Sequence, residues 1–197
     1  MISIFDYGAG NLRSVENTLG AIGAPYKRIR TPEELRVSSK LILPGVGHFG
    51  QMMRALSEMK VREALLDTIQ SGVPFLGICL GLQALFSDSE EAPDEQGLGL
   101  FPGTVRRFQC DMRIPHMGWN QLERRRESKL LRNTGDQPYL YFAHSYYAPV
   151  VDATSAVCDY SLPYTAVLEH KNISGVQFHP EKSGDLGLRI VRNFIEG

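Results

Sequence analysis

Residues 73–81 read Val73-Pro74-Phe75-Leu76-Gly77-Ile78-Cys79-Leu80-Gly81. The apolar run before Cys79 predicts a buried strand, and Leu80–Phe86 predicts a helix directly behind it. A sharp strand-to-helix turn strains the backbone at its tip, where neighbouring side chains would clash. Gly77, Cys79 and Gly81 therefore have the spacing of a nucleophile elbow, with a thiol in place of a hydroxyl. The alternative is a buried structural cysteine beside two turn glycines.

Strands and helices alternate around this junction in the first half of the chain. Ile2–Phe5 and Leu41–Leu43 are short apolar strands, and helical spacing of apolar residues begins at Asn11. Thr31-Pro32-Glu33-Glu34 is a capping box that starts a further helix. One helical stretch follows Gly47 and stops at Gly72. This order predicts an α/β fold, in which helices cover both faces of a parallel sheet.

The second half of the chain is richer in strands. The predicted strands are Thr104–Phe108, Tyr139–Ala143, Ser155–Asp159, Tyr164–His170 and Ile173–Phe178. A closing helix is predicted over Leu186–Ile195. The complete sheet is therefore expected to be mixed but mostly parallel.

Composition restricts the class of protein. The chain has 197 residues and a formal net charge of −1, with 43% hydrophobic and 22% charged residues. That length predicts a single domain, residues 1–197, and the balanced charge argues against a nucleic-acid partner. No apolar run approaches the roughly 18 residues of a membrane span, so no membrane association is expected.

The three cysteines are Cys79, Cys110 and Cys158, which are widely spaced and form no CxxC pair. They predict neither a disulfide framework nor a zinc site. Asp6 interrupts the apolar start of the chain and no basic segment precedes it, which argues against a signal peptide. We therefore expect a cytoplasmic protein in which Cys110 and Cys158 are inert.

A thiol nucleophile needs a base, and the base needs an orienting group. His179 directly follows the last predicted strand, and Pro180 makes the turn after it rigid. Glu181 is close enough in sequence for its carboxylate to hold the imidazole. Cys79, His179 and Glu181 together predict a catalytic triad, although His179 alone could be a structural strand-end histidine.

Two long motifs resemble those of a known family, the class I glutamine amidotransferases. They are Gly77-Ile78-Cys79-Leu80-Gly81-Leu82-Gln83 and Gly175-Val176-Gln177-Phe178-His179-Pro180-Glu181-Lys182-Ser183, about a hundred residues apart. Further segments are similar to the glutaminase subunits of imidazole glycerol phosphate synthases, namely residues 6–15, Pro44-Gly45-Val46-Gly47, Pro115-His116-Met117-Gly118-Trp119-Asn120 and His144-Ser145-Tyr146. The resemblance implies a flavodoxin-like glutamine amidotransferase domain that covers the whole chain.

The resemblance also implies a role for each matching residue. Cys79 would attack the glutamine carboxamide and form a glutamyl thioester. His179 would take the thiol proton and pass it to the departing ammonia, while Glu181 orients the imidazole. Three residues would bind the glutamine substrate, and these are Gln83, Ser145 and Tyr146.

An oxyanion hole is implied beside the nucleophile. The glycine-rich turn containing Gly45, Val46 and Gly47 would lie next to the backbone N–H of Leu80, and glycine lets a peptide plane adopt either orientation. The resemblance implies that this peptide must turn before the hole is complete. Without the cysteine motif, Pro44-Gly45-Val46-Gly47 would be interpreted as a β-turn alone.

The partner implied by the resemblance is a cyclase subunit with a (β/α)8 barrel, which forms a heterodimer with the glutaminase. The cyclase would use the ammonia to form imidazole glycerol phosphate and aminoimidazole carboxamide ribotide in histidine biosynthesis. Asn11, Trp119 and Lys182 are the expected contacts with that partner. No cofactor is expected, and the histidines show no metal-ligand spacing.

Other interpretations remain open at this point. A related glutaminase could supply a different synthase, such as one that amidates a surface-polysaccharide sugar, and the vitamin B6 glutaminase subunit fits less well. A non-catalytic subunit that kept the fold is an alternative of another class. A cysteine peptidase or chaperone of similar fold is the last alternative. The run Arg124-Arg125-Arg126 is interpreted as a solvated face because glutamates flank it.

Overall fold

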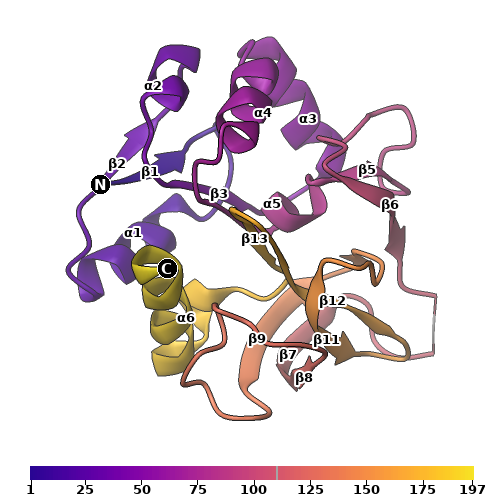
Figure 1. The fold of residues 1–197 in the computed structure, drawn as a ribbon. Helices are drawn as coiled ribbons and strands as arrows, with labels where there is room; N and C mark the ends of the chain where they lie inside the picture. The colour runs from indigo at the N-terminus through magenta and orange to yellow at the C-terminus, as the bar shows by residue number, and fades with distance from the viewer. Residues whose placement is uncertain (110) are drawn as a thin grey trace.

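The computed structural model describes residues 1–109 and 111–197, and Figure 1 shows a central sheet between helices. The strands of this sheet are β1 (Ile2–Phe5), β2 (Tyr26–Ile29), β3 (Leu41–Gly45), β4 (Phe75–Cys79), β8 (Glu123–Arg124), β11 (Thr154–Asp159), β12 (Pro163–His170) and β13 (Ile173–Val176). Their order is β2-β1-β3-β4-β13-β12-β11-β8. Strands β2 to β13 in this order run parallel, and β12, β11 and β8 continue antiparallel. The predicted mixed, mostly parallel sheet is confirmed.

Helices cover both faces of the sheet, as predicted. α1 (Leu12–Ala21) and α6 (Gly184–Glu196) lie on one face, and α2 (Pro32–Arg36), α3 (Phe49–Glu58) and α4 (Arg62–Gln70) lie on the other. None of the helices in the described part of the chain is long and apolar enough to cross a membrane.

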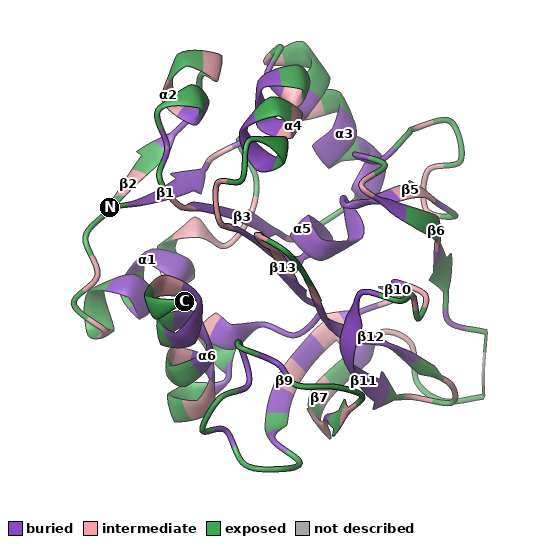
Figure 2. Cartoon of the chain, viewed as in Figure 1, coloured by how far each residue is buried: buried purple, intermediate pink, exposed green. Residues whose placement is uncertain are grey.

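Two apolar cores lie on the opposite faces of the sheet. Successive residues of a strand point to opposite faces, so Leu41 and Leu43 enter one core and Ile42 enters the other. Figure 2 shows that β3 and its neighbours β1 and β4 are buried along their whole length. Burial on both faces explains why these strands are continuous apolar runs in the sequence.

Strand β13 is the last in the chain but lies in the middle of the sheet, between β4 and β12. Its register pairs Gly175 with Gly77 and Val176 with Ile78. The carboxyl ends of the two strands therefore lie side by side. This topology brings the segment after β13, which contains His179, beside Cys79 at the end of β4.

Two smaller sheets flank the end of β4. β5 (Phe86–Ser89), β6 (Phe101–Arg107) and β10 (Tyr146–Tyr147) form one of them, and β7 (His116–Gln121) pairs with β9 (Tyr139–His144) in the other. The β7–β9 pair is antiparallel. Along β9 buried residues alternate with exposed or half-buried ones, whereas His116 is the one buried residue of β7.

The helix predicted over Leu80–Phe86 is shorter in the structure. Only α5 (Leu80–Gln83) is helical, and Phe86 already begins β5. The carbonyl of Ala84 accepts a hydrogen bond from the N–H of Leu98, which lies outside the helix. This tertiary bond replaces further helical turns, and nothing in the local sequence pattern predicts it.

The single helical stretch predicted between Gly47 and Gly72 is two helices, α3 and α4. Lys60 lies between them with φ +55°, and the N–H of Val61 bonds back to the carbonyl of Leu56. This is the left-handed turn that commonly ends a helix, but here a lysine occupies the position that glycine usually takes.

No strand is predicted within Pro115-His116-Met117-Gly118-Trp119-Asn120, but residues 116–121 form β7. The edge strand β2 also has no counterpart among the predicted strands. Its residues Tyr26, Lys27 and Arg28 are exposed or half-buried, so they lack the apolar run of a central strand.

The arginine run is not simply a solvated face. Arg124 Nη2 donates to the carbonyls of Leu131 and Gly135 at 2.7 and 2.6 Å. Arg126 Nη2 donates to the carbonyl of Ala153 at 2.8 Å. Arg125 lies at the surface as expected, with its Nε 3.6 Å from the exposed carboxylate of Glu123. The two flanking arginines tie loops to the sheet.

Candidate active site

Cys79 stands at the turn from β4 into α5 with φ +53°, a strained conformation for a residue other than glycine. A Cβ on Gly77 would lie 2.4 Å from the carbonyl oxygen of Gly81. A Cβ on Gly81 would lie 2.0 Å from the carbonyl oxygen of Leu43. The backbone thus has the geometry of a nucleophile elbow, and close approach of main-chain atoms explains both glycines.

His179 and Glu181 form a buried pair next to this turn. His179 Nδ1 lies 2.8 Å from Glu181 Oε1, and the two side chains are only 2% and 3% exposed. The carboxylate accepts, so Nδ1 carries the proton in this bond and Nε2 is the nitrogen left for the thiol. The second residue of the short helix η1 (Pro180–Lys182) therefore fixes the orientation of the imidazole.

The main chain of His179 is anchored from two sides. Its N–H donates to the carbonyl of Tyr141 in β9 at 2.8 Å. Ser183 Oγ donates to the carbonyl of His179 at 2.7 Å and accepts from the N–H of Tyr141 at 3.0 Å. The hydroxyl of Ser183 thus joins the turn to β9, which explains the serine at the end of the second motif.

The pKa of His179 reflects opposing effects. Burial lowers it because the imidazolium loses hydration. The Cys79 sulfur, and after it the Glu181 carboxylate, outweigh burial and raise the pKa of His179 to about 10. His179 therefore holds a proton at neutral pH beside the Cys79 sulfur, which is the state expected of a cysteine–histidine pair.

Gln177 is a site residue that sequence reasoning missed, although it lies within the second motif. It is fully buried, and its Nε2 donates to Cys79 Sγ at 3.5 Å. Its Oε1 accepts from Gln83 Nε2 at 3.1 Å, and the same Gln83 nitrogen donates to the carbonyl of Tyr146 at 2.8 Å. The amide side chains of Gln177 and Gln83 thus connect the thiol to β10.

A cavity of about 260 Å³ opens directly on Cys79. Gln83, Ser145 and Tyr146, the predicted substrate-binding residues, all line it. Met117 and Pro115 line its side toward β7. The cavity is large enough for a small amino acid side chain and backbone, and the nucleophile lies in its wall.

The predicted oxyanion residues divide into two groups. Val46, Gly47 and Leu80 line the cavity, and Gly47 has φ +99°. Gly45 lies behind them in β3, opposite Cys79 in the register. A Cβ on Gly45 would lie 2.7 Å from that of Leu80, so close packing explains this glycine rather than freedom to turn.

Glu91 also lines the cavity, and no sequence motif drew attention to it. Its Oε2 accepts from the N–H of Phe49 at the start of α3 at 2.7 Å. This bond holds a carboxylate in the wall of the cavity that contains the nucleophile. Such a carboxylate suits the ammonium group of an amino acid.

Two of the predicted partner contacts lie together on an exposed face. Trp119 is 55% exposed, and its ring centroid lies 6.2 Å from that of Tyr141 on the paired strand. Lys182 Nζ lies 5.8 Å from the centroid of the same tyrosine ring. Met117 and Tyr139 are exposed on this face too. We call Met117, Trp119, Tyr139 and Tyr141 the aromatic face.

Asn11 is the third predicted partner contact, and it lies at the N-cap of α1. Its Oδ1 accepts from Ser14 Oγ at 2.8 Å, whereas its side chain makes no capping bond to a backbone N–H.

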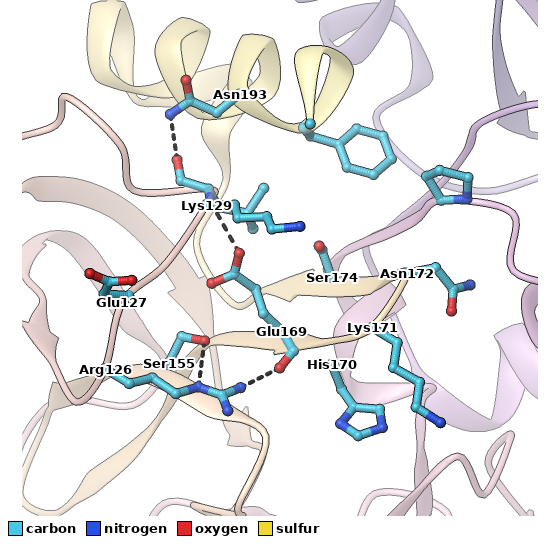
Figure 3. Close-up of a pocket in the computed structure, with 14 residues that line it drawn as sticks. Arg126, Glu127, Lys129, Ser155, Glu169, His170, Lys171, Asn172, Ser174 and Asn193 are labelled. Carbon is cyan, nitrogen blue, oxygen red and sulfur yellow. Dashed lines mark hydrogen bonds between the residues drawn. The ribbon is translucent and has the colours of Figure 1, made fainter.

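A larger cavity of about 390 Å³ lies at the opposite end of the sheet, between the start of β13 and the end of α6 (Figure 3). Several of its polar groups bond to one another or to the main chain. Arg126 donates to Ser155 Oγ at 3.2 Å and to the carbonyl of Glu169, whose carboxylate accepts from the N–H of Leu130 at 3.1 Å. No cysteine is among the residues lining it, so the nucleophilic chemistry belongs to the smaller cavity.

Within residues 1–109 and 111–197, no group of three or more His, Cys, Asp or Glu side chains is placed to hold a metal ion. Burial raises the pKa of the Cys158 thiol to about 12, so this cysteine stays protonated and unreactive near neutral pH, as expected. Cys110 lies outside the described residues, and its inertness stays a prediction.

Comparison with known proteins agrees with this geometry. The family model described as glutamine amidotransferase class-I matches residues 3–196. The chain is 50% identical, over its whole length and 98% of the relative's, to imidazole glycerol phosphate synthase subunit HisH of Methanothermobacter thermautotrophicus. It is 42% identical to the subunit of the same name from Chlorobium luteolum, over all of both chains.

Solved structures agree in fold. A crystal structure titled as a glutamine amidotransferase superimposes with a TM-score of 0.77 at 20% identity, covering 99% of this chain and 97% of that one. PurLQS from Thermotoga maritima superimposes with a TM-score of 0.76 at 18% identity and the same coverage. The chain thus belongs to the class I glutamine amidotransferase family and, within it, to the family of imidazole glycerol phosphate synthase subunits HisH.

Proposed function

We propose that this chain hydrolyses L-glutamine to glutamate and ammonia and delivers the ammonia to the cyclase subunit of imidazole glycerol phosphate synthase in histidine biosynthesis. The observation that carries the proposal is the strained Cys79 in a cavity wall, facing the buried His179–Glu181 pair. Residues 1–197 would act as one glutamine amidotransferase domain in the cytoplasm.

The first half of the reaction forms a thioester. The Cys79 sulfur, whose proton is held by His179, attacks the side-chain carbonyl carbon of glutamine. The tetrahedral intermediate collapses as His179 gives that proton to the amide nitrogen, which leaves as ammonia. Glu181 keeps Nε2 of His179 directed at the reacting atoms and stabilises the imidazolium.

The second half of the reaction releases glutamate. His179, now neutral, takes a proton from water, and the oxygen of that water attacks the thioester carbon. The carbon–sulfur bond breaks and the thiolate of Cys79 is regenerated beside the imidazolium. In both halves, backbone N–H groups of Leu80 and of the segment Val46–Gly47 would stabilise the oxyanion.

Substrate recognition follows from the groups lining the cavity. The carboxylate of Glu91 would bind the α-ammonium group of glutamine. Ser145 and Tyr146 would hold the amino-acid end through backbone and side chain, and Gln83 would contact the substrate from the helix side. The Glu91 carboxylate complements a free α-ammonium group, which a residue inside a peptide lacks.

The proposed partner is a (β/α)8-barrel cyclase that forms a heterodimer with this chain. The aromatic face, with Lys182 beside it, offers the exposed aromatic residues that anchor interfaces. Its residue Met117 also lines the cavity, so a partner docked there would lie next to the site that releases ammonia. Ammonia kept from bulk water stays unprotonated and nucleophilic.

The test is glutaminase activity of the pure chain, alone and with a purified cyclase subunit and its ribonucleotide substrate. We expect a low rate alone and a strong rise in the mixture. Cys79→Ala should abolish glutamine-dependent synthesis but leave synthesis from added ammonia, which controls for a damaged complex. Glutaminase activity that never rises would point to a different synthase, and no glutamate formation with reduced Cys79 would overturn the proposal.

A further inference from the structure

Three polar side chains are buried beneath the β7–β9 pair without a role in the proposed chemistry. They are His116 in β7, His144 at the end of β9 and Tyr164 in β12, which are 4%, 6% and 0% exposed. Tyr164 Oη lies 3.1 Å from His116 Nδ1 and 3.2 Å from His144 Nε2. One tyrosine hydroxyl therefore joins two histidines from different strands.

The acceptor at one end fixes the direction of every bond in this group. His144 Nδ1 lies 2.8 Å from the carbonyl oxygen of Tyr146, which can only accept, so Nδ1 carries the proton. His144 Nε2 must then accept from the hydroxyl of Tyr164. The single proton of that hydroxyl is then donated to His144, so its oxygen accepts from His116 Nδ1. His116 Nε2 accepts from Asn120 Nδ2 at 3.4 Å.

The bonds continue from the Tyr146 carbonyl to the nucleophile. Gln83 Nε2 donates to this carbonyl and to Gln177 Oε1, and Gln177 Nε2 donates to Cys79 Sγ. The Tyr146 carbonyl therefore accepts from both His144 and Gln83. The series that begins at Asn120 ends at this carbonyl, and Gln83 donates both to it and toward the thiol through Gln177.

Both histidines are neutral, as the direction of these hydrogen bonds requires. Burial lowers the pKa of His116 to about 4. Burial also lowers the pKa of His144 to about 3, against the opposing effect of the Tyr146 carbonyl. Neither ring gains a second proton near neutral pH, so each keeps one donor and one acceptor nitrogen.

We infer that Tyr164 is a positioning residue for glutamine hydrolysis, because its hydroxyl, acting through His144, holds the Tyr146 carbonyl and the Gln83 amide in the substrate cavity. The inference rests on the proposed function. It also connects the cavity to β7, since His116 completes the bonding of the same hydroxyl and belongs to the strand that carries Trp119.

The decisive variant is Tyr164→Phe, which removes the hydroxyl but keeps the ring. Tyr147→Phe is the matched control, since Tyr147 packs against Phe108 in the same aromatic cluster, with ring centroids 4.7 Å apart, but its hydroxyl is not part of the series. Both variants are assayed in complex with the cyclase subunit. We expect Tyr164→Phe to raise the KM for glutamine about tenfold, the effect of one lost hydrogen bond, with kcat changed less than about twofold.

The division between KM and kcat separates positioning from a general loss of structure. Partial unfolding would lower kcat through a smaller active fraction and leave KM unchanged. Equal KM values in Tyr164→Phe and Tyr147→Phe, with an active wild-type complex, would overturn the inference alone. A wild-type complex that does not hydrolyse glutamine would overturn the proposed function and this inference with it.

A spectroscopic measurement tests the arrangement even if Tyr164→Phe does not fold. Nitrogen-15 spectra of the histidine rings in the wild-type complex should show His116 and His144 as neutral Nδ1–H tautomers at pH 7. Free histidine prefers the other tautomer, so this result is specific to the bonding described. A ring that is charged, or protonated on Nε2, would contradict the direction of the bonds and overturn the inference.

Discussion

Gln177 Nε2 lies 3.5 Å from Cys79 Sγ, although the two residues are 98 positions apart in the chain. The contact exists because β13 pairs with β4 in parallel, so that Cys79 and Gln177 lie side by side at the carboxyl ends of the two strands. Because the amide N–H donates to the sulfur, it stabilises negative charge on the sulfur, and the negatively charged sulfur is the nucleophile. The same amide accepts from Gln83, so Gln177 joins the nucleophile to the wall of the substrate cavity.

Replacing Gln177 with leucine keeps a similar volume but removes both bonds. We expect Gln177→Leu to lower kcat for glutamine hydrolysis about tenfold, which corresponds to about 1.4 kcal/mol of lost stabilisation. Steady-state assays of the complex measure it. Gln137→Leu is the surface control, because Gln137 is exposed and its side chain, among the residues that the structure describes, bonds only to the half-buried Gln121. A kcat equal to that of the control would show that Gln177 does not act on the thiol.

The pH behaviour of His179 can be assigned to its neighbours. Because the Cys79 sulfur is the larger cause of its raised pKa and Glu181 the smaller, Cys79→Ala should lower the pKa of His179 more than Glu181→Gln does. Nitrogen-15 titration of His179 in the three proteins measures the order. A larger fall in Glu181→Gln would mean that the carboxylate, and not the thiol, holds the proton on His179.

The raised pKa of His179 determines how its contribution to the stability of the folded chain changes with pH. A histidine whose pKa is higher in the folded than in the unfolded chain contributes stability that is fully present below about pH 6.5. That contribution is lost as the pH rises through about 10. In Cys79→Ala the loss should occur at lower pH, which denaturant unfolding across this range would measure.

Much of this site could be predicted from the sequence because its signals are local. Gly77, Cys79 and Gly81 mark the elbow within five residues, and His179 and Glu181 lie in one turn. The capping box at Thr31 is likewise confirmed, with Glu34 N–H donating to its hydroxyl at 3.3 Å. Short-range backbone geometry decides each of these features, so residue type and spacing suffice to identify them.

The parts that could not be predicted depend on contacts between distant segments. Glu91 enters the cavity because Phe49 at the start of α3 holds its carboxylate, and no motif records that pairing. The early end of α5 depends on a bond from Leu98. Strand β7 has Gly118 at φ +139° and His116 as its one buried residue, so its sequence lacks the apolar pattern of a buried strand.

The glycines of the elbow allow a direct test of packing. Gly81→Ala would place a Cβ 2.0 Å from the carbonyl oxygen of Leu43, which is main chain and cannot move away easily. We expect a loss of about 3 kcal/mol or more in the free energy of unfolding, because overpacking in a rigid core forces backbone shifts.

Gly20→Ala is the matched control for that substitution. Gly20 lies in α1 with nothing within 4 Å of the added Cβ, so alanine should stabilise the chain by about 0.5–1 kcal/mol. Urea unfolding of both variants measures the two changes. Similar effects of the two alanines would mean that helix propensity, and not the approach of Leu43, sets the requirement at Gly81.

The aromatic face leads to a prediction about association. Trp119 is 55% exposed and its ring lies beside Tyr141 on the neighbouring strand, so Trp119→Ala should leave the stability of the isolated chain within about 1 kcal/mol. Binding to the cyclase subunit should weaken by about 2 kcal/mol or more, the usual effect of removing an aromatic anchor. Tyr26→Ala is the control, because Tyr26 is an exposed aromatic residue on the edge strand β2. Calorimetric titration of each variant with the cyclase decides: equal affinities would place the partner on another surface, and an unfolded Trp119→Ala would show that the indole supports the β7–β9 pair itself.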